Sequence, residues 1–144
     1  MPRVQPSAAL PRMNDDIARV PAPPGFPPFS LAVAHGGVLH VSGAGPVEAD
    51  GRIPHDFAAQ FHAVIRNLRA ALEAGGSAMD RVLKTTVWLT RAGDVAEMNR
   101  LYAGSFPPDA RPARTTAVVA ALPVPEFLIE IECVAALRAP TPPD

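Results

Sequence analysis

The feature that most constrains the fold of this chain is an apolar stripe along residues 57–72. Its members recur at spacings of three and four, the period of an amphipathic helix with one buried face. They are Phe57, Phe61, Val64, Ile65, Leu68 and Leu72. Asp56 can cap the first turn, and Gly75-Gly76 supplies residue types that end helices in left-handed geometry. A helix with one apolar face must pack against a second layer of structure.

Runs of β-branched and apolar residues supply that second layer. Strands are expected at residues 30–34, 38–42, 81–89, 114–120 and 127–137. His35-Gly36-Gly37 reads as the turn between the first two strands. A second helix is expected from about residue 94 to 105, where Asp94 and Glu97 have capping-box spacing. The order β-β-α-β-α-β-β predicts an α+β fold with a single mixed sheet and both helices on one face.

Proline marks the limits of the folded part. Eight of the 18 prolines fall in residues 1–28, and three more close the chain. Because proline lacks an amide hydrogen, these ends are poor candidates for helix or sheet interiors. We therefore expect an extended or partly disordered arm at 1–27, one domain at 28–138 and a loose tail at 139–144.

Charge and cysteine usage narrow the classes of partner. The formal net charge is −1, so no broad basic field exists to attract nucleic acid or anionic lipid. The single cysteine, Cys133, cannot form an internal disulfide, which favours a reducing compartment. No apolar run resembles a secretory signal or approaches the roughly 20 residues of a membrane helix. We expect a soluble, cytoplasmic protein that does not bind membranes.

Two carboxylates stand out in the last strand. Side chains alternate between faces along a strand, so Ile129, Ile131 and Cys133 are expected to face the helices. Glu130 and Glu132 then share the opposite face, which indicates a polar site or an ion pair between subunits. The alternative is an ordinary solvated face.

Arg114 shares a face with Thr116 and Val118 in the preceding strand by the same alternation. If the last two strands pair as an antiparallel hairpin, Arg114 and Glu130 lie together at its open end. An arginine fixed there presents a planar fork of donors suited to a carboxylate ligand. The alternative is an ordinary ion pair with Glu130 or Glu132.

The sheet face away from the helices is expected to carry apolar side chains that would otherwise be exposed to water. Val118 and Trp88 are among the apolar groups expected on it. Contact with other subunits would bury this face, so we expect a closed homo-oligomer.

Several motifs, taken in order, resemble a known family. Pro112-Ala113-Arg114-Thr115-Thr116, a Leu122-Pro123 turn and Ile129-Glu130-Ile131-Glu132 resemble the C-terminal signature of the YjgF/RidA family of reactive-intermediate deaminases. Upstream matches occur at Val41-Ser42-Gly43, at 56–60, at Lys84-Thr85-Thr86-Val87, and at Asn99 with Tyr102. The resemblance covers residues from about 28 to 138.

This resemblance implies a chorismate-mutase-like fold and a homotrimer with active sites in the clefts between subunits. Family members hydrolyse enamine and imine intermediates to keto acids and ammonia without a metal or an organic cofactor. By the same resemblance, Arg114 would hold the carboxylate of a small metabolite and Glu130 would position or activate the water. The pocket would be lined by Ser42, by backbone groups of Gly43 and Thr116, and by Asn99. The four histidines lack partners at metal-ligand spacing, so we expect no metal.

Two positions depart from the family pattern. Phe29 stands where family members carry a tyrosine, and Thr116 stands where a cysteine commonly follows the arginine. Both changes indicate a divergent member whose pocket is more apolar and suited to a larger substrate. Cys133 does not replace the missing thiol, because its face is the one expected to pack on the helices.

Two other classes of function stay open. RNA cleavage or binding is attributed to some relatives, but the near-zero charge and the lack of a basic stripe with exposed aromatic residues argue against it. A non-catalytic trimer that binds metabolites or proteins is the other alternative. The presence of both Arg114 and Glu130 argues against that second class.

Overall fold

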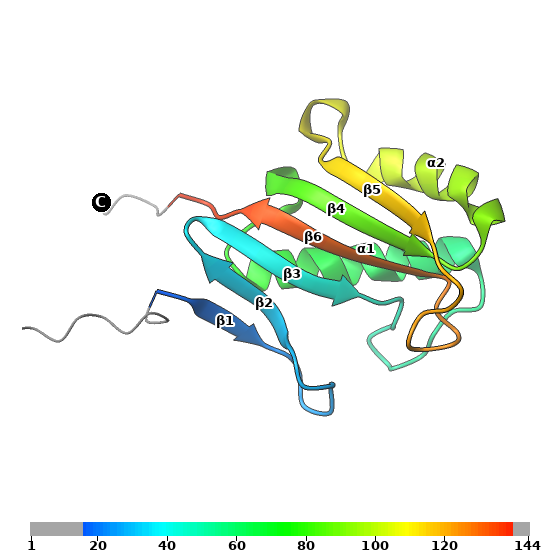
Figure 1. The fold of residues 1–144 in the computed structure, drawn as a ribbon, viewed down its shortest axis with the longest axis horizontal. Coiled ribbons are helices and arrows are strands. Elements are labelled where there is room, and N and C mark those ends of the chain that lie inside the picture. The colour runs from blue at the N-terminus through cyan, green and yellow to red at the C-terminus, as the bar shows by residue number, and fades with distance from the viewer. Residues whose placement is uncertain (1–15, 140–144) are drawn as a thin grey trace, which may run out of the picture.

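A computed structural model describes residues 16–139 of the chain. Six strands form one mixed sheet in the order β1-β2-β3-β6-β4-β5, and all neighbours are antiparallel except β4 and β5, which are parallel. The strands are β1 (Ala18–Pro21), β2 (Ser30–His35), β3 (Val38–Ala44), β4 (Val82–Leu89), β5 (Ala113–Val118) and β6 (Ile129–Ala136). The helices are α1 (Phe57–Ala74) and α2 (Val95–Ser105). Both helices lie behind the sheet in Figure 1, so the predicted fold class is confirmed.

The apolar stripe of α1 and the inward side of the sheet form the core. All six residues of the stripe are buried, together with β-strand residues that alternate with exposed ones. Asp56 caps α1 as predicted, because its carboxylate accepts a hydrogen bond from the Ala59 amide at 3.0 Å. Of the two glycines after the helix, only Gly76 is left-handed, with φ of +87°; Gly75 has φ of −88°. Neither helix of the described part is long and apolar enough to cross a membrane.

Strand β1 was not predicted from the sequence. It pairs with β2 inside the segment that was expected to be an arm, although prolines stand close to it. Pro21 ends the strand at a register shift, where an amide hydrogen is not needed for the ladder. The sheet therefore has six strands instead of five. Residues 1–15 of the expected arm and residues 140–144 of the expected tail lie outside the described part.

The predicted hairpin between the last two strands is wrong, because β4 lies between β5 and β6. Thr85 of β4 is the register partner of Arg114 on one side and of Cys133 on the other. At the far end of β4, the Val119 amide donates to the Leu89 carbonyl at 2.7 Å as the chain turns back toward β6. The alternation of apolar residues specifies which side of a strand is buried, but it does not specify the neighbouring strand.

The predicted capping box at α2 is also wrong. Asp94 has helical backbone angles and makes no capping hydrogen bond with its side chain. Its carboxylate instead accepts hydrogen bonds from the Arg91 guanidinium at 2.7 and 3.1 Å. This local ion pair competes with the cap for the same two oxygen atoms.

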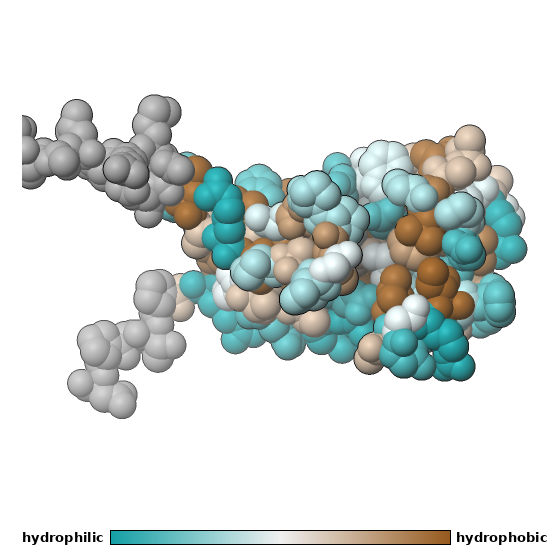
Figure 2. Space-filling model, turned by 90° about the horizontal axis from the view of Figure 1, so that it is seen from below, coloured by the Kyte–Doolittle hydropathy of each residue, from teal (hydrophilic) through white to brown (hydrophobic). Residues whose placement is uncertain are grey.

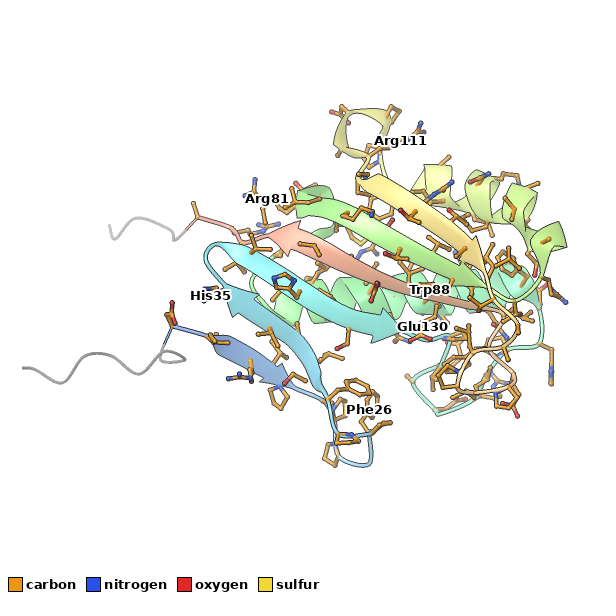
Figure 3. The ribbon with its side chains drawn as sticks, viewed as in Figure 1. Phe26, His35, Arg81, Trp88, Arg111 and Glu130 are labelled. Carbon is orange, nitrogen blue, oxygen red and sulfur yellow. The ribbon has the colours of Figure 1, made fainter. Side chains whose placement is uncertain are left out.

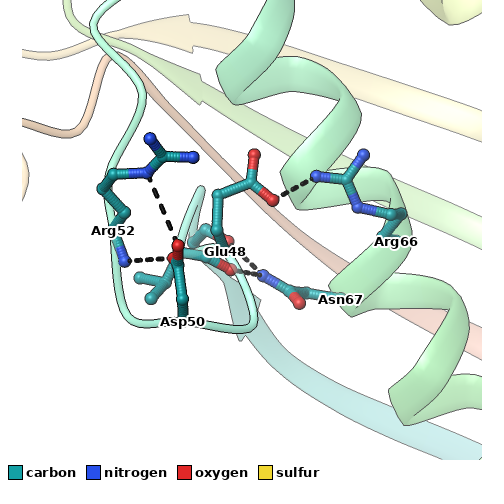
Figure 4. A network of polar contacts seen from close by, with 7 residues as sticks. Glu48, Asp50, Arg52, Arg66 and Asn67 are labelled. Carbon is teal, nitrogen blue, oxygen red and sulfur yellow. Dashed lines mark hydrogen bonds and ion pairs between the residues drawn. The ribbon is translucent and has the colours of Figure 1, made fainter.

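The connection from β3 to α1 is held against the helix by polar contacts (Figure 4). Asn67 of α1 donates to the backbone carbonyls of Gly45 and Val47 at 2.8 and 2.9 Å. Arg66, one residue earlier, donates to the Glu48 carboxylate at 2.5 Å. In the view from below, apolar side chains gather at this end of the molecule, whereas hydrophilic ones line the lower border (Figure 2).

Gln60 joins the same connection to the start of β6. Its amide nitrogen donates to the carbonyls of Pro54 and Glu126 at 2.8 and 2.9 Å, and its oxygen accepts from the Leu128 amide at 2.8 Å. The Gln60 side chain is 1% exposed, so all three bonds are shielded from water. The end of β3 and the beginning of β6 are thereby fixed relative to each other.

Candidate functional site

Arg114 lies on the edge strand β5 and is held by side chains of α2. Its guanidinium donates to the Asn99 side-chain oxygen at 2.7 Å and lies 4.8 Å from the centre of the Tyr102 ring. The bond to Asn99 uses Nη2 of Arg114, and the second terminal nitrogen, Nη1, is 3.7 Å from the Met98 sulfur. The Tyr102 hydroxyl shares a buried hydrogen bond of 2.7 Å with Thr85. We call Arg114, Asn99, Tyr102 and Thr116 the Arg114 half-site.

The Arg114 half-site leaves the arginine free to take a ligand. Within residues 16–139, no ion pair joins Arg114 to a carboxylate, so the ordinary ion pair considered from the sequence is not present there. Arginine has five N–H donors in a planar fork, and Asn99 occupies one of its terminal nitrogens. The exposed guanidinium can therefore receive a carboxylate with its remaining donors.

Glu130 is placed by the absence of a side chain at Gly43. The Glu130 carboxylate lies over Gly43, and a Cβ at that position would overlap with its Oε1 atom. The register shift between Val41 and Ala44 sets Gly43 in an irregular part of β3. Next to it, the Ser42 hydroxyl donates to the Ser30 carbonyl at 2.6 Å. We call Glu130, Gly43, Ser42 and Phe29 the Glu130 half-site.

The surroundings of Glu130 favour its protonated form. Partial burial raises the pKa of this carboxyl above its ordinary value, and the negative charge of Glu132 raises it further. Trp88 is the register partner of Glu130 on β4 and supplies part of this apolar setting (Figure 3). A carboxyl whose pKa is raised is a stronger base once it is ionised, which suits it to proton transfer.

Cys133 belongs to the core, as predicted. It is 4% exposed and pairs with Val41 and Thr85 on the side of the sheet that faces the helices. Burial, and to a lesser degree Glu132, raises the pKa of its thiol to about 12. The thiol is therefore not a nucleophile at neutral pH.

The two half-sites lie on opposite sides of the sheet in one chain, which corrects the expectation that Arg114 and Glu130 meet at the end of a hairpin. Arg114 is in register with the buried Thr85 and shares the helix side, whereas Glu130 is in register with Trp88 on the open side. Val118 is in register with the buried Leu89, so it also lies on the helix side of the sheet. It was expected on the opposite, open face. Each half-site is partly exposed to solvent.

Neither of two open hollows on the surface joins the half-sites. One of about 470 Å³ lies at the β3–α1 connection and is lined by Glu48, Arg52, Ile53, Pro54, His55 and Ala59. The other, of about 250 Å³, lies on the open face and includes Lys84 and Glu132. Arg114 and Glu130 line neither of them.

Tyr102 was matched to the family pattern together with Asn99 but was not among the residues expected to form the site. It is buried in α2, and its ring also supports Arg114. The signal was its spacing of three from Asn99, which puts both residues on one helix face. That spacing could have identified Tyr102 only if the position of β5 had been known.

Comparison with known proteins agrees with the fold. Residues 21–137 match the family described as Endoribonuclease L-PSP. The 2-iminobutanoate/2-iminopropanoate deaminase of Escherichia coli is 35% identical over 129 residues, which is 88% of this chain and 100% of that protein. The mitochondrial protein mmf2 of Schizosaccharomyces pombe is 35% identical over 111 residues, covering 76% of this chain and 87% of that protein.

A solved structure of a related protein has the same fold. The crystal structure of RidA from the Antarctic bacterium Psychrobacter sp. has a TM-score of 0.73 at 31% identity and covers 83% of this chain and 94% of that chain. The class defined by the fold is therefore the YjgF/RidA-like α+β sheet with two helices on one face. The chain belongs to the Endoribonuclease L-PSP family, in which relatives carry the names YjgF, RidA and RutC.

Proposed function

We propose that this protein is a hydrolytic deaminase of small enamine and imine carboxylates, which it converts to keto acids and ammonia. The observation that carries the proposal is the Arg114 guanidinium, which is exposed, supported by Asn99 and Tyr102, and without a carboxylate partner among the described residues. A related protein, 35% identical, is named 2-iminobutanoate/2-iminopropanoate deaminase, which supports the same class of reaction here.

The active site is proposed to form between subunits of a homotrimer. One chain would contribute its Arg114 half-site and the neighbouring chain its Glu130 half-site. Within one chain the register places Arg114 opposite Thr85 and Glu130 opposite Trp88, which lies three residues further along β4. Three residues of strand correspond to roughly 10 Å, and the two side chains also point to opposite faces, so one chain cannot place both on one small substrate.

The proposed reaction requires orientation and movement of protons. Arg114 would hold the substrate carboxylate with two parallel hydrogen bonds. Glu130 would take a proton from water as the water oxygen attacks the imine carbon, and would then pass that proton to the imine nitrogen, which becomes the amine of a carbinolamine. Glu130 would next take the proton of the carbinolamine hydroxyl and pass it to that amine. The carbon–nitrogen bond would then break, so that the keto acid forms and ammonia leaves. A positioned acid–base group of this kind contributes roughly 100- to 10,000-fold to the rate.

The test uses imino acids generated in solution by an amino acid oxidase, with keto-acid release as the measurement. We expect the protein to accelerate release, and Arg114→Ala to lower kcat/KM by about 100-fold or more, because two charge-assisted hydrogen bonds are lost. Arg111→Ala is the matched control, since this neighbouring arginine is also exposed but belongs to neither half-site. Equal rates for wild type and Arg114→Ala would contradict the proposed role.

Subunit mixing tests the shared site. Arg114→Ala and Glu130→Gln chains are each expected to be inactive alone. When they are co-assembled in equal amounts, about one quarter of the interfaces would contain both intact half-sites, as random closed assembly predicts. Recovery of activity supports the shared site, and no recovery in mixed trimers would contradict it.

RNA cleavage is the second candidate, because the description of the matching family names an endoribonuclease. The net charge of −1 gives little electrostatic attraction for a phosphate backbone. Salt-dependent cleavage of single-stranded RNA that is lost in Arg114→Ala would favour this function over deamination.

A further inference from the structure

Two phenylalanines stand exposed on the connection between β1 and β2. Phe26 is 51% exposed and Phe29 is 43% exposed, and their ring centres are 6.2 Å apart in an edge-to-face arrangement. Exposed aromatic pairs of this kind bury little of each other and leave apolar area available for a ligand or partner. The core of the chain does not account for their position.

The connection holds these rings in a fixed place. It contains four prolines at residues 23, 24, 27 and 28, which restrict the backbone. The Phe26 amide donates to the Pro23 carbonyl at 3.2 Å, and the Phe29 amide donates to the Pro27 carbonyl at 2.8 Å. Gly25, with φ of +88°, makes the bend that turns the chain between them. A wall ordered in advance loses little conformational entropy when a ligand packs on it.

A series of neighbouring residues leads from this pair to Glu130. Phe29 precedes Ser30, whose carbonyl accepts the 2.6 Å hydrogen bond from Ser42. Ser42 adjoins Gly43, over which the Glu130 carboxylate lies. Figure 3 shows Phe26 at the lower end of β2, on the side toward the end of β3 where Glu130 is labelled. Trp88 flanks Glu130 on the other side.

We propose that Phe26 and Phe29 form an apolar wall of the active site that selects imino acids with bulky apolar side chains. This inference rests on the proposed deaminase function and names its substrate class. The amides of both phenylalanines are used within the loop, so the exposed rings offer a ligand apolar area without a free amide of their own. Leucine-like or phenylalanine-like side chains would therefore be favoured over small ones, which bury less apolar area on the rings.

The test compares two imines, one derived from leucine and one from alanine, each generated by an amino acid oxidase. Wild type is expected to have the higher kcat/KM for the leucine-derived imine. Phe26→Ala is expected to lower the ratio of the two kcat/KM values by about ten-fold, the usual size of discrimination by an apolar pocket. Phe26→Leu should keep most of the ratio, and Val47→Ala, a change at another exposed apolar residue, should leave it unchanged.

Binding measurements separate this inference from the proposed function. Calorimetry with 4-methyl-2-oxopentanoate and with pyruvate reports selectivity without any reaction, and the affinity ratio should also fall in Phe26→Ala. If both imines are hydrolysed and the ratio of their kcat/KM values is unchanged in Phe26→Ala, the proposed role of the two phenylalanines is contradicted and the deaminase function is not. If neither imine is hydrolysed but the larger keto acid binds more tightly in a way that depends on Phe26, the deaminase function is contradicted. The proposed selection of bulky apolar groups by the two phenylalanines would then still be supported. Absence of both would overturn both.

Discussion

The Arg114 half-site and the Glu130 half-site are positioned by opposite means. Arg114 is held by contacts, because its guanidinium donates to the Asn99 side-chain oxygen, lies over the Tyr102 ring and approaches the Met98 sulfur. Glu130 depends on the absence of a side chain at Gly43, because its carboxylate occupies the volume that a Cβ at residue 43 would fill. Mutations should therefore weaken the Arg114 half-site by removing groups and the Glu130 half-site by adding them.

The two half-sites also differ in charge environment. The guanidinium is exposed and positively charged, so its proposed function is to fix an anion. The Glu130 carboxyl is partly buried beside Glu132, so its pKa is raised and its protonation can change during a reaction. The proposed binding and proton transfer thus lie on different faces of the chain, and both could reach one substrate only where two chains meet.

Among variants that leave Arg114 and Glu130 themselves unchanged, the largest effect is expected from Gly43→Ala. The added methyl group overlaps with the end of the flexible Glu130 side chain, so the carboxylate should rotate away while the backbone stays in place. We expect kcat/KM for imine hydrolysis to fall about 100-fold, the scale of a misplaced acid–base group, with little change in Tm. Gly93→Ala is the control, since nothing lies within 4 Å of an added Cβ there. A large drop in Tm would instead assign Gly43 to stability of the sheet.

A smaller effect is expected at Tyr102, where two variants separate its two contacts. Tyr102→Leu removes the ring from Arg114 and should raise KM roughly ten-fold, in line with the upper range of cation–π interactions. Tyr102→Phe keeps the ring but leaves the buried Thr85 hydroxyl without its partner, which should lower the free energy of unfolding by about 1–2 kcal/mol. Denaturant unfolding and steady-state kinetics on both variants distinguish the two roles. An equal rise in KM in both would show that the hydroxyl, and not the ring, supports Arg114.

Much of the fold could be predicted from the sequence because its signals are local. The stripe of α1 and the alternation in β6 each report which side is buried, and both were found. Strand β1 was missed because its surrounding prolines indicate an arm, and only its place at the edge of the sheet makes a strand compatible with them. The neighbours of β5 were missed because pairing depends on residues distant in the sequence, which no local pattern encodes.

The residues of the candidate site could be proposed from the sequence, but their arrangement could not. Arg114 and Glu130 were identified by residue type and family resemblance, and alternation put Glu130 on the correct face. The position of Arg114 relative to Glu130 depended on the assumed hairpin and was therefore wrong. The support from Tyr102 was hidden for a related reason, since a buried tyrosine in a helix stripe is typical of a core residue.

The smallest effect concerns the pH dependence of Glu130. Its folded-state pKa is raised, so the ionised folded form is penalised, and this loss of stability grows as the pH rises from the unfolded pKa through the folded one. Glu132→Gln removes one cause of the shift and should lower the pKa of Glu130. The acid limb of kcat/KM should therefore move to lower pH, and Tm should increase at pH 8 but not at a pH where both carboxyls are protonated. Glu73→Gln makes the same charge change on an exposed part of α1 and should move neither quantity. If the acid limb of kcat/KM does not move in Glu132→Gln, burial alone raises the pKa of Glu130. The Glu130 half-site would then depend on the packing around this carboxyl and not on the charge of Glu132.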